Sequence, residues 1–477
     1  MKSFLLPFSL ALPLATALAA AVGPDYQRPA LPSALAWKVA AAPTAALPRD
    51  DWWTLFDDPV LAELETRALH ANQNLAAAAA RVEQARAAAG AARSGYFPSV
   101  GARPSLERAR TSETTDNKFP VAETTTYRGV LDAAWELDLF GRVRRLNESA
   151  RADAAASAAD YANVRLALTA EVATTYFSLR AVDREAALLA DGVALRRRAL
   201  QLVNSRREGG AATDFDVARA ETELAATEAE TSALANRRAA LQNALAVLLG
   251  AAAPDFQLST LSSRLSAAPS IPAVPAGIPS ELLERRPDIA AAEATLAAAN
   301  ARIGVAQAAF FPALSLTGSF GTASGDLDRL FQSDSSLWSI GPSLYLPIFQ
   351  GGRNRANLAR SRAAYDESVA LFRQRVLVAF REVQDGLTAT QLLADQADAQ
   401  ERAVAAARRA GELAQTRYDA GYVAYFEVID AQRTVLAAER GATQLTAQRL
   451  LNTVGLIKAL GGGWTRPVAL ALHSPAP

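Results

Sequence analysis

Apolar and polar positions alternate along the segment between residues 127 and 139. One set of positions is mostly apolar: Tyr127, Gly129, Leu131, Ala133, Trp135, Leu137 and Leu139. The other set is largely charged: Arg128, Val130, Asp132, Ala134, Glu136 and Asp138. A period of two predicts a β-strand with one oily face and one charged face. We predict four strands of this kind in the chain, at about 98–108, 127–140, 312–322 and 337–349.

These strands have the length of membrane strands. Thirteen residues that rise about 3.3 Å each can cross a bilayer when tilted, which takes roughly 9–11 residues. An aromatic residue near a strand end, such as Tyr127 or Trp338, fits an interfacial girdle. A soluble sandwich with one face on a core stays open as the alternative. Because about eight strands are the usual minimum for a barrel, a barrel would need several chains.

Apolar spacings of three and four predict long helices in much of the remaining sequence. One such seam is typical of a coiled coil: Val369, Phe372, Val376, Phe380, Val383 and Leu387. We predict two helices of 67 residues, 142–208 and 353–419, each about 100 Å long. Gly209-Gly210 and Gly421 are suited to ending them, because glycine favours the left-handed position after a helix. Return helices are predicted at 213–249 and 426–460.

A shorter helix precedes each pair of strands. The first is predicted at 60–94 and the second at 280–309. Both stop before an aromatic-Phe-Pro sequence, because proline cannot continue a helix. Ser280 suits an N-cap, and Pro287 is expected to kink or restart the second helix.

The two halves of the chain repeat each other. Residues 60–265 and 280–464 match at an offset of 211 residues over most of their length, and at 214 upstream. The matched pairs include Gly90/Gly304, Phe97/Phe311, Arg197/Arg408, Gly210/Gly421, Phe215/Phe426 and Glu228/Glu439. We therefore predict an internal duplication, with a linker at 266–279 and a C-terminal tail at 465–477.

The N-terminal segment has the pattern of an export signal. Lys2 precedes an apolar stretch from Phe4 to Leu18, and small residues fit a cleavage site after it. We predict a signal peptide at 1–21 and an N-terminal extension at 22–59. A membrane anchor is the alternative, although two prolines interrupt the apolar stretch.

The composition argues against several kinds of chemistry. The chain has 49 basic and 49 acidic residues, so no net charge attracts it to nucleic acid. It has no cysteine and only two histidines, His70 and His473. Thiol catalysis is excluded, and histidine catalysis and the common metal sites are disfavoured. We expect no catalytic site, no cofactor and no metal, and the protein is not predicted to be an enzyme.

Six blocks of sequence carry a resemblance to a known family: Gly23-Pro24-Asp25-Tyr26-Gln27-Arg28-Pro29, Trp135-Glu136-Leu137-Asp138-Leu139-Phe140-Gly141-Arg142, Arg285-Arg286-Pro287-Asp288-Ile289, Phe310-Phe311-Pro312, Leu346-Pro347-Ile348-Phe349 and Lys458-Ala459-Leu460-Gly461-Gly462-Gly463-Trp464. The chain resembles the TolC-like outer-membrane efflux proteins, in the OprM/NodT-type branch that serves resistance-nodulation-division pumps. The resemblance implies a mixed α and β protein of the Gram-negative outer membrane. It implies a homotrimer whose twelve strands form one β-barrel, continuous with a periplasmic α-helical barrel. It also implies docking to a periplasmic adaptor (membrane fusion) protein and to an inner-membrane pump of that class.

The sequence departs from this family at one position. Members of the branch often carry a lipid-modified cysteine a few residues before the Pro-Asp-Tyr sequence. Here that neighbourhood is Leu18-Ala19-Ala20-Ala21-Val22-Gly23. We therefore expect no lipidation, and the strands alone must anchor the protein in the lipid bilayer.

The candidate functional residues follow the second long helix. Glu427 and Asp430 are three residues apart, so they share one helix face just beyond Gly421. In a trimer with its axis past this face, six carboxylates would ring the pore and select for cations. The alternative is that these acids only interact with the helix dipole, worth about 0.3–1 kcal/mol each. The resemblance favours the gate, because the family's periplasmic constriction is made by acids at these positions.

Two further pairs are predicted near the helical tips. Thr213 and Asp216 have the spacing of a helix-capping pair. The resemblance implies closed-state links between neighbouring coiled coils, and the matching residues are Tyr418 and Asp214. A basic partner that some relatives place four or five residues after this tyrosine is absent, since Tyr422 and Val423 occupy those positions.

Three functional hypotheses follow from the sequence. The leading one is a passive trimeric exit duct that conducts drugs or other small toxic compounds from a periplasmic pump to the exterior, with an acidic gate. A related alternative is the outer-membrane outlet of a type I protein secretion system. The alternative from a different class is a soluble periplasmic coiled-coil scaffold.

Overall fold

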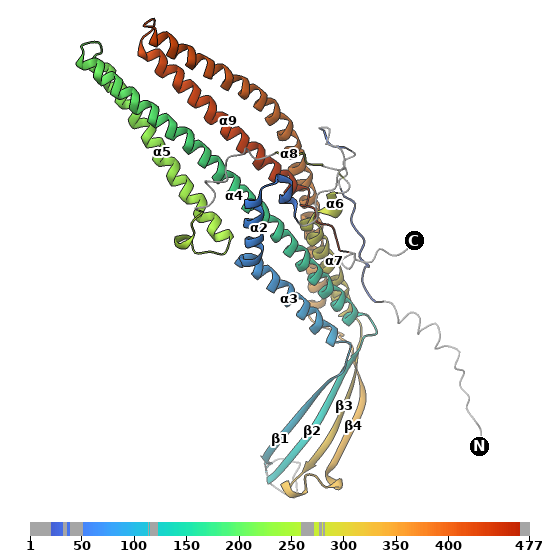
Figure 1. Cartoon of the computed structure of the whole chain (residues 1–477). Helices are drawn as coiled ribbons and strands as arrows, with labels where there is room; N and C mark the ends of the chain where they lie inside the picture. The colour runs from blue at the N-terminus through green and yellow to red at the C-terminus, as the bar shows by residue number, and fades with distance from the viewer. Residues whose placement is uncertain are drawn as a thin grey trace, which may run out of the picture.

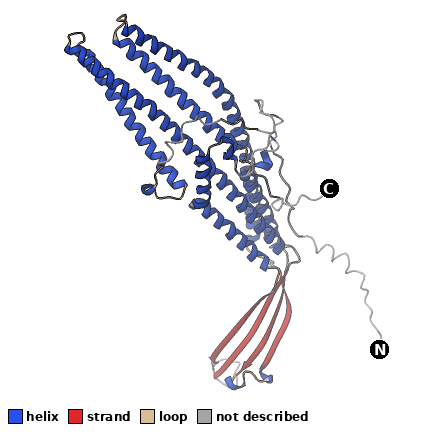
Figure 2. Ribbon diagram, viewed as in Figure 1, coloured by secondary structure: helices blue, strands red, loops and turns tan. Residues whose placement is uncertain are grey.

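The computed structural model describes residues 21–31, 36–38, 51–112, 114, 123–258, 271–275, 279 and 282–467. The molecule is elongated, with long helices at one end and a four-stranded sheet at the other (Figures 1 and 2). Residues 1–20 of the predicted signal peptide lie outside the described residues, as do most of the predicted linker, the proposed N-cap Ser280 and the tail beyond residue 467.

Two helices of 67 residues run through most of the molecule. They are α4 (Arg142–Glu208) and α8 (Arg353–Asp419), with the bounds expected from the sequence. Each continues into an antiparallel helix of 35 residues, α5 (Asp214–Leu248) or α9 (Tyr425–Ala459), and both pairs turn at the same end of the molecule (Figure 1). Gly210 and Gly421 follow the long helices with φ of 75° and 76°, which is the left-handed conformation that ends a helix.

The helix predicted at 60–94 is wrong as a single element. It is broken at Asn72 into α2 (Pro59–Ala71) and α3 (Gln73–Ser94). The Asn72 side chain accepts a hydrogen bond from the backbone N–H of Leu75 and donates one to the Leu248 carbonyl. Asn72 therefore caps α3, which begins a new helix there.

The helix predicted at 280–309 is also divided. A short α6 (Leu282–Arg285) precedes α7 (Pro287–Ala308), with Pro287 at the first position of the new helix. Arg286 is extended, as expected for a residue before proline. Its guanidinium donates to the Asp288 carboxylate at 2.8 Å and to the Ala459 carbonyl at 2.9 Å, which ties this break to the end of α9.

The sheet consists of antiparallel strands in the order β1-β2-β3-β4. Their bounds are Ser99–Arg110, Glu123–Leu137, Ala313–Ser324 and Ser336–Tyr345. The strand predicted at 127–140 therefore begins earlier and ends earlier, and the one predicted at 337–349 ends at Tyr345. Tyr345 pairs with Ala313, the first residue of β3, so the chain beyond it has no ladder partner, and Pro347 lacks an N–H to donate. Strands β1 and β3 each extend two residues beyond the ends predicted at 108 and 322.

The two faces of the sheet differ in polarity, as the alternation predicted. Leu131, Phe320 and Trp338 pair across three strands in one row, with exposed fractions of 51%, 65% and 74%. The next positions along the strands belong to the other face and are polar. There the Ser319 and Ser339 hydroxyls lie 2.7 Å apart, and Arg103 lies 3.6 Å from Asp132. The sheet thus has one apolar face open to its surroundings and one polar face.

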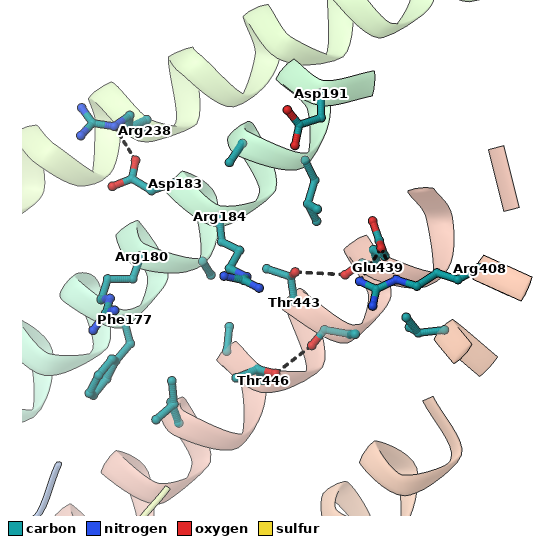
Figure 3. Close-up of a pocket in the computed structure, with 17 residues that line it drawn as sticks. Phe177, Arg180, Asp183, Arg184, Asp191, Arg238, Arg408, Glu439, Thr443 and Thr446 are labelled. Carbon is teal, nitrogen blue, oxygen red and sulfur yellow. Dashed lines mark hydrogen bonds and ion pairs between the residues drawn. The ribbon is translucent and has the colours of Figure 1, made fainter. Parts of the chain in front are cut away.

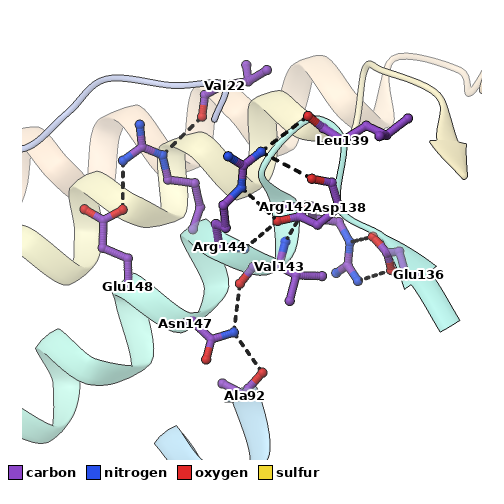
Figure 4. A network of polar contacts seen from close by, with 11 residues as sticks. Val22, Ala92, Glu136, Asp138, Leu139, Arg142, Val143, Arg144, Asn147 and Glu148 are labelled. Carbon is purple, nitrogen blue, oxygen red and sulfur yellow. Dashed lines mark hydrogen bonds and ion pairs between the residues drawn. The ribbon is translucent and has the colours of Figure 1, made fainter. Parts of the chain in front are cut away.

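A polar network joins the sheet to the helices (Figure 4). The Asp138 carboxylate accepts hydrogen bonds from the backbone N–H groups of Val143 at 3.0 Å and Arg144 at 2.8 Å. These bonds satisfy free donors at the start of α4, so Asp138 leaves the strand and β2 ends at Leu137. Arg145 of α4 donates to the Val22 carbonyl at 3.3 Å, which attaches the N-terminal extension to the same junction.

The main core lies in the middle of the molecule, where the two repeats meet. The 3-10 helix η2 (Trp52–Phe56) of the N-terminal extension inserts Trp52 and Phe56 there. They belong to one cluster with Phe177 of α4, Phe372 of α8 and Ile457 of α9. No helix in the described ranges is both long enough and apolar enough to span a bilayer.

Both ends of the described chain contact the buried Glu293 of α7. Arg28 lies 2.6 Å from its carboxylate and Arg466 lies 2.5 Å from it. Burial alone would raise the pKa of Glu293, but the hydrogen bonds from the two arginines hold that pKa below its usual value. The N-terminal extension and the C-terminal segment are thereby fixed to the second repeat.

Candidate gate at the helical tip

The two candidate gate acids lie in the first turns of α9, at the tip. Val428 sits between Glu427 and Asp430 in sequence and is fully buried, whereas both acids are exposed. The guanidinium of Arg417 lies 3.9 Å from the Glu427 carboxylate, which is a weak surface ion pair. The buried valine thus orients this stretch of helix, and the two carboxylates face solvent.

The tip of the first repeat contains a reciprocal capping box. The Thr213 hydroxyl accepts a hydrogen bond from the backbone N–H of Asp216, and the Asp216 carboxylate accepts one from the backbone N–H of Thr213 at 2.9 Å. Hydrogen bonds from the Thr213 hydroxyl and backbone lower the pKa of Asp216. This arrangement starts α5 and satisfies donors that would otherwise be free.

The implied Tyr418–Asp214 link is not formed within this chain. The Asp214 carboxylate instead lies 3.2 Å from Arg207. The Tyr418 hydroxyl is buried and has no hydrogen-bond partner among the described residues. Its ring packs against Tyr425 with centroids 5.1 Å apart, and the guanidinium of Arg206 lies 4.6 Å from its centroid. A Tyr418–Asp214 link in a closed assembly stays a prediction.

The family model for outer membrane efflux proteins matches residues 64–251 and 278–462. The chain belongs to this family. One matched range lies within the first predicted repeat and the other overlaps most of the second, and residues 252–277 between them are not matched. The resemblance drawn from the sequence blocks is confirmed, and with it the mixed α and β fold and the location in the outer membrane.

Individual relatives are similar over nearly their whole length. Outer membrane protein OprJ of Pseudomonas aeruginosa is 37% identical over 95% of each chain. The solvent efflux pump outer membrane protein SrpC of Pseudomonas putida is 37% identical over 93% of this chain and 95% of its own. The open-state structure of the Neisseria gonorrhoeae MtrE outer membrane channel has a TM-score of 0.82 at 32% identity, covering 93% of this chain and 98% of that one.

The duplication of this outer membrane efflux protein is visible in matching ion pairs. Arg197 lies 2.7 Å from Glu228 between α4 and α5, and Arg408 lies 2.6 Å from Glu439 between α8 and α9. These four residues are the repeat partners already noted at an offset of 211. The same ion pair therefore connects the two helices of each pair at equivalent positions along their length.

A groove of about 790 Å³ lies between the two helical pairs of this efflux protein (Figure 3). Its floor includes apolar side chains of α4, α8 and α9: Phe177, Leu188, Val404 and Leu450. Several of its charged groups are paired with each other, as Asp183 is with Arg238 at 2.6 Å. The sequence did not single out this groove, because it is formed by four helices from both repeats; of the repeat positions noted in the sequence, Arg408 and Glu439 line it.

Proposed function

We propose that three copies of this chain form the exit duct of a tripartite efflux pump. The duct passively conducts small toxic compounds from a periplasmic pump to the exterior, and Glu427 and Asp430 form its periplasmic gate. A periplasmic adaptor and an inner-membrane resistance-nodulation-division pump are the proposed partners. The names of relatives support this, since SrpC is described as part of a solvent efflux pump.

One observation carries the proposal: the sheet is open and its apolar face is exposed. Leu131, Phe320 and Trp338 lie in one row on that face. Strands β1 and β4 are the two edges of the sheet in the described chain, so each can pair with a further strand. Three copies would supply twelve strands, which is above the roughly eight needed to close a barrel. Lipid would cover the apolar face, and the polar face would line the lumen.

The functional experiment is drug accumulation in a Gram-negative host that lacks its own efflux outlet. Cells that carry a compatible adaptor and pump, together with this protein, are expected to accumulate less of a fluorescent efflux dye than cells with adaptor and pump alone. The difference should disappear when the proton gradient is collapsed. Equal accumulation in both strains, with the protein present in the outer membrane, would refute the proposed function.

Neighbouring residues on opposite faces of β3 provide a matched pair of variants for this assay. Phe320→Arg places a charge in contact with lipid on the apolar face of each chain, which costs about 0–1 kcal/mol near the membrane interface and rises to about 2–4 kcal/mol toward the middle of the bilayer. We expect it to lower outer-membrane assembly and efflux. Ser319→Arg places the same charge on the polar face and should retain assembly. Equal assembly of the two variants would contradict the assignment of the faces.

A further inference from the structure

We propose that Arg206 and Arg219 act as positioning residues of the gate. They hold the tip of the second helical pair against the tip of the first through cation–π contacts with Tyr418 and Phe426, and we call these two contacts the tip latch. The inference rests on the proposed gate, because the latch would set how readily the helices carrying Glu427 and Asp430 move.

The two contacts connect all four helices at the tip. The guanidinium carbon of Arg206 on α4 lies 4.6 Å from the ring centroid of Tyr418 on α8. The guanidinium carbon of Arg219 on α5 lies 3.8 Å from the ring centroid of Phe426 on α9. Both distances are within the roughly 6 Å over which a cation is attracted to an aromatic face. Each contact runs from the first repeat to the second.

The Tyr418 ring, not its hydroxyl, makes this contact. The side chain is 6% exposed, although it lies near the end of a helix at the tip. Its hydroxyl has no hydrogen-bond partner in the described part of the chain. The ring is enclosed by Arg206 on one side and by Tyr425 in a tilted arrangement, with an interplanar angle of 57°. Contacts of the aromatic ring thus account for the burial of Tyr418. Phenylalanine has the same ring and would make the same contacts.

The two repeats differ at the tip in a complementary way. At the offset of 211 residues, Arg207 of the first repeat is equivalent to Tyr418 of the second, and Arg219 is equivalent to Asp430. These two cationic positions of the first repeat are therefore aromatic or acidic in the second, whereas Arg206 matches Arg417 and Phe426 matches Phe215. One ion pair also joins the two tips, with the cation on the second repeat: Arg433 of α9 lies 3.7 Å from Glu223 of α5. The first tip and the second tip attract each other through unlike groups.

The latch residues are adjacent to the gate acids in sequence. Phe426 immediately precedes Glu427, and Arg417, which lies 3.9 Å from Glu427, immediately precedes Tyr418. A movement of the second helical pair away from the first would separate both rings from their arginines. The same movement would carry Glu427 and Asp430 with it, so loss of the latch should favour the open state.

The test compares variants that remove the ring with one that keeps it. Tyr418→Leu with Phe426→Leu removes both rings, and Arg206→Gln with Arg219→Gln removes both cations. Each double variant is expected to raise the ratio of open to closed channels in planar bilayers at least five- to thirtyfold, which is roughly the effect of losing the two cation–π contacts of a single chain. Tyr418→Phe should behave as the parent, and Arg206→Lys should largely restore closure. If Tyr418→Phe raises the ratio of open to closed channels as much as the leucine variant does, the latch is overturned. A link through the Tyr418 hydroxyl would then keep the channel closed.

A distance measurement separates the latch from the gate. The chain has no cysteine, so spin labels at Glu208→Cys and Asp419→Cys report the separation of the two tips. In the labelled trimer, diluted with unlabelled chains, the Arg206→Gln, Arg219→Gln variant should shift the distances within one chain to longer values. Unchanged distances would overturn the latch. Longer distances with unchanged conductance would support the latch and refute the gate formed by Glu427 and Asp430.

Discussion

Replacing Glu427 and Asp430 together with alanine is expected to raise single-channel conductance severalfold and to weaken the preference for cations. In the proposed trimer the change removes six carboxylates from the narrowest part of the duct. Both acids are exposed, and the ion pair of Glu427 with Arg417 is long at 3.9 Å, so little of this charge is neutralised within the chain. Trimer assembly should persist, because exposed acids at a helix start contribute only about 0.3–1 kcal/mol each. Planar bilayer recordings at matched salt and pH measure the effect.

A control for this experiment is available on the same helical pair. Asp398 and Glu401 are also exposed acids three residues apart, but they lie on α8 away from the tip. Their double alanine variant removes the same charge and should leave conductance and selectivity unchanged. If the tip variant also has the conductance and ion selectivity of the parent, the two acids only stabilise the start of α9, and the gate is refuted.

Glu65→Gln is expected to stabilise the helical part of the protein at neutral and alkaline pH. Glu65 of α2 is completely buried, and neither carboxylate oxygen has a hydrogen-bond partner in the described chain. Burial raises the pKa of Glu65 to about 9. Because the folded chain keeps this proton while the unfolded chain releases it near pH 4.3, the free energy of unfolding falls by about 1.4 kcal/mol per pH unit between these values. At pH 7 the loss is about 4 kcal/mol per chain.

Thermal melting by circular dichroism in detergent tests this at two pH values. At pH 5 the parent should be only about 1 kcal/mol less stable than Glu65→Gln and should melt only slightly lower, because the penalty starts where the unfolded carboxyl ionises, near pH 4.3, and grows with pH. At pH 8 the variant should melt higher. Glu63→Gln, an exposed acid two residues away on the same helix, is the control and should leave both melting temperatures unchanged. A variant that melts lower than the parent at pH 8 would show that Glu65 is ionised and paired.

The long elements were predictable because their signals are local. The 67-residue helices end at glycines, and the strands alternate with period two, so neither depends on knowing what packs against them. The break at Asn72 was missed because its side chain bonds to Leu248, more than 170 residues away. The strand ends shifted because their limits are set by pairing, as for Tyr345 with Ala313. Contacts between residues distant in sequence therefore determine where the helix breaks and where the strands end.

The candidate site was predictable only in part for the same reason. The spacing of Glu427 and Asp430 along one helix is local, and so is the Thr213–Asp216 capping box. The contacts of Tyr418 are not local, since Arg206 lies 212 positions before it on another helix. The burial of Glu65 depends likewise on how α2 packs on α4, and the sequence presents it only as one more acid on a helix.

The mass of the protein in mild detergent tests most directly whether several chains complete one channel. The chain of 50.3 kDa has four strands in an open sheet, and three copies without their leaders would have a mass of about 145 kDa. We expect native mass spectrometry of the outer-membrane extract to give this trimer. A folded, detergent-soluble monomer of about 48 kDa as the only species would contradict the exit duct.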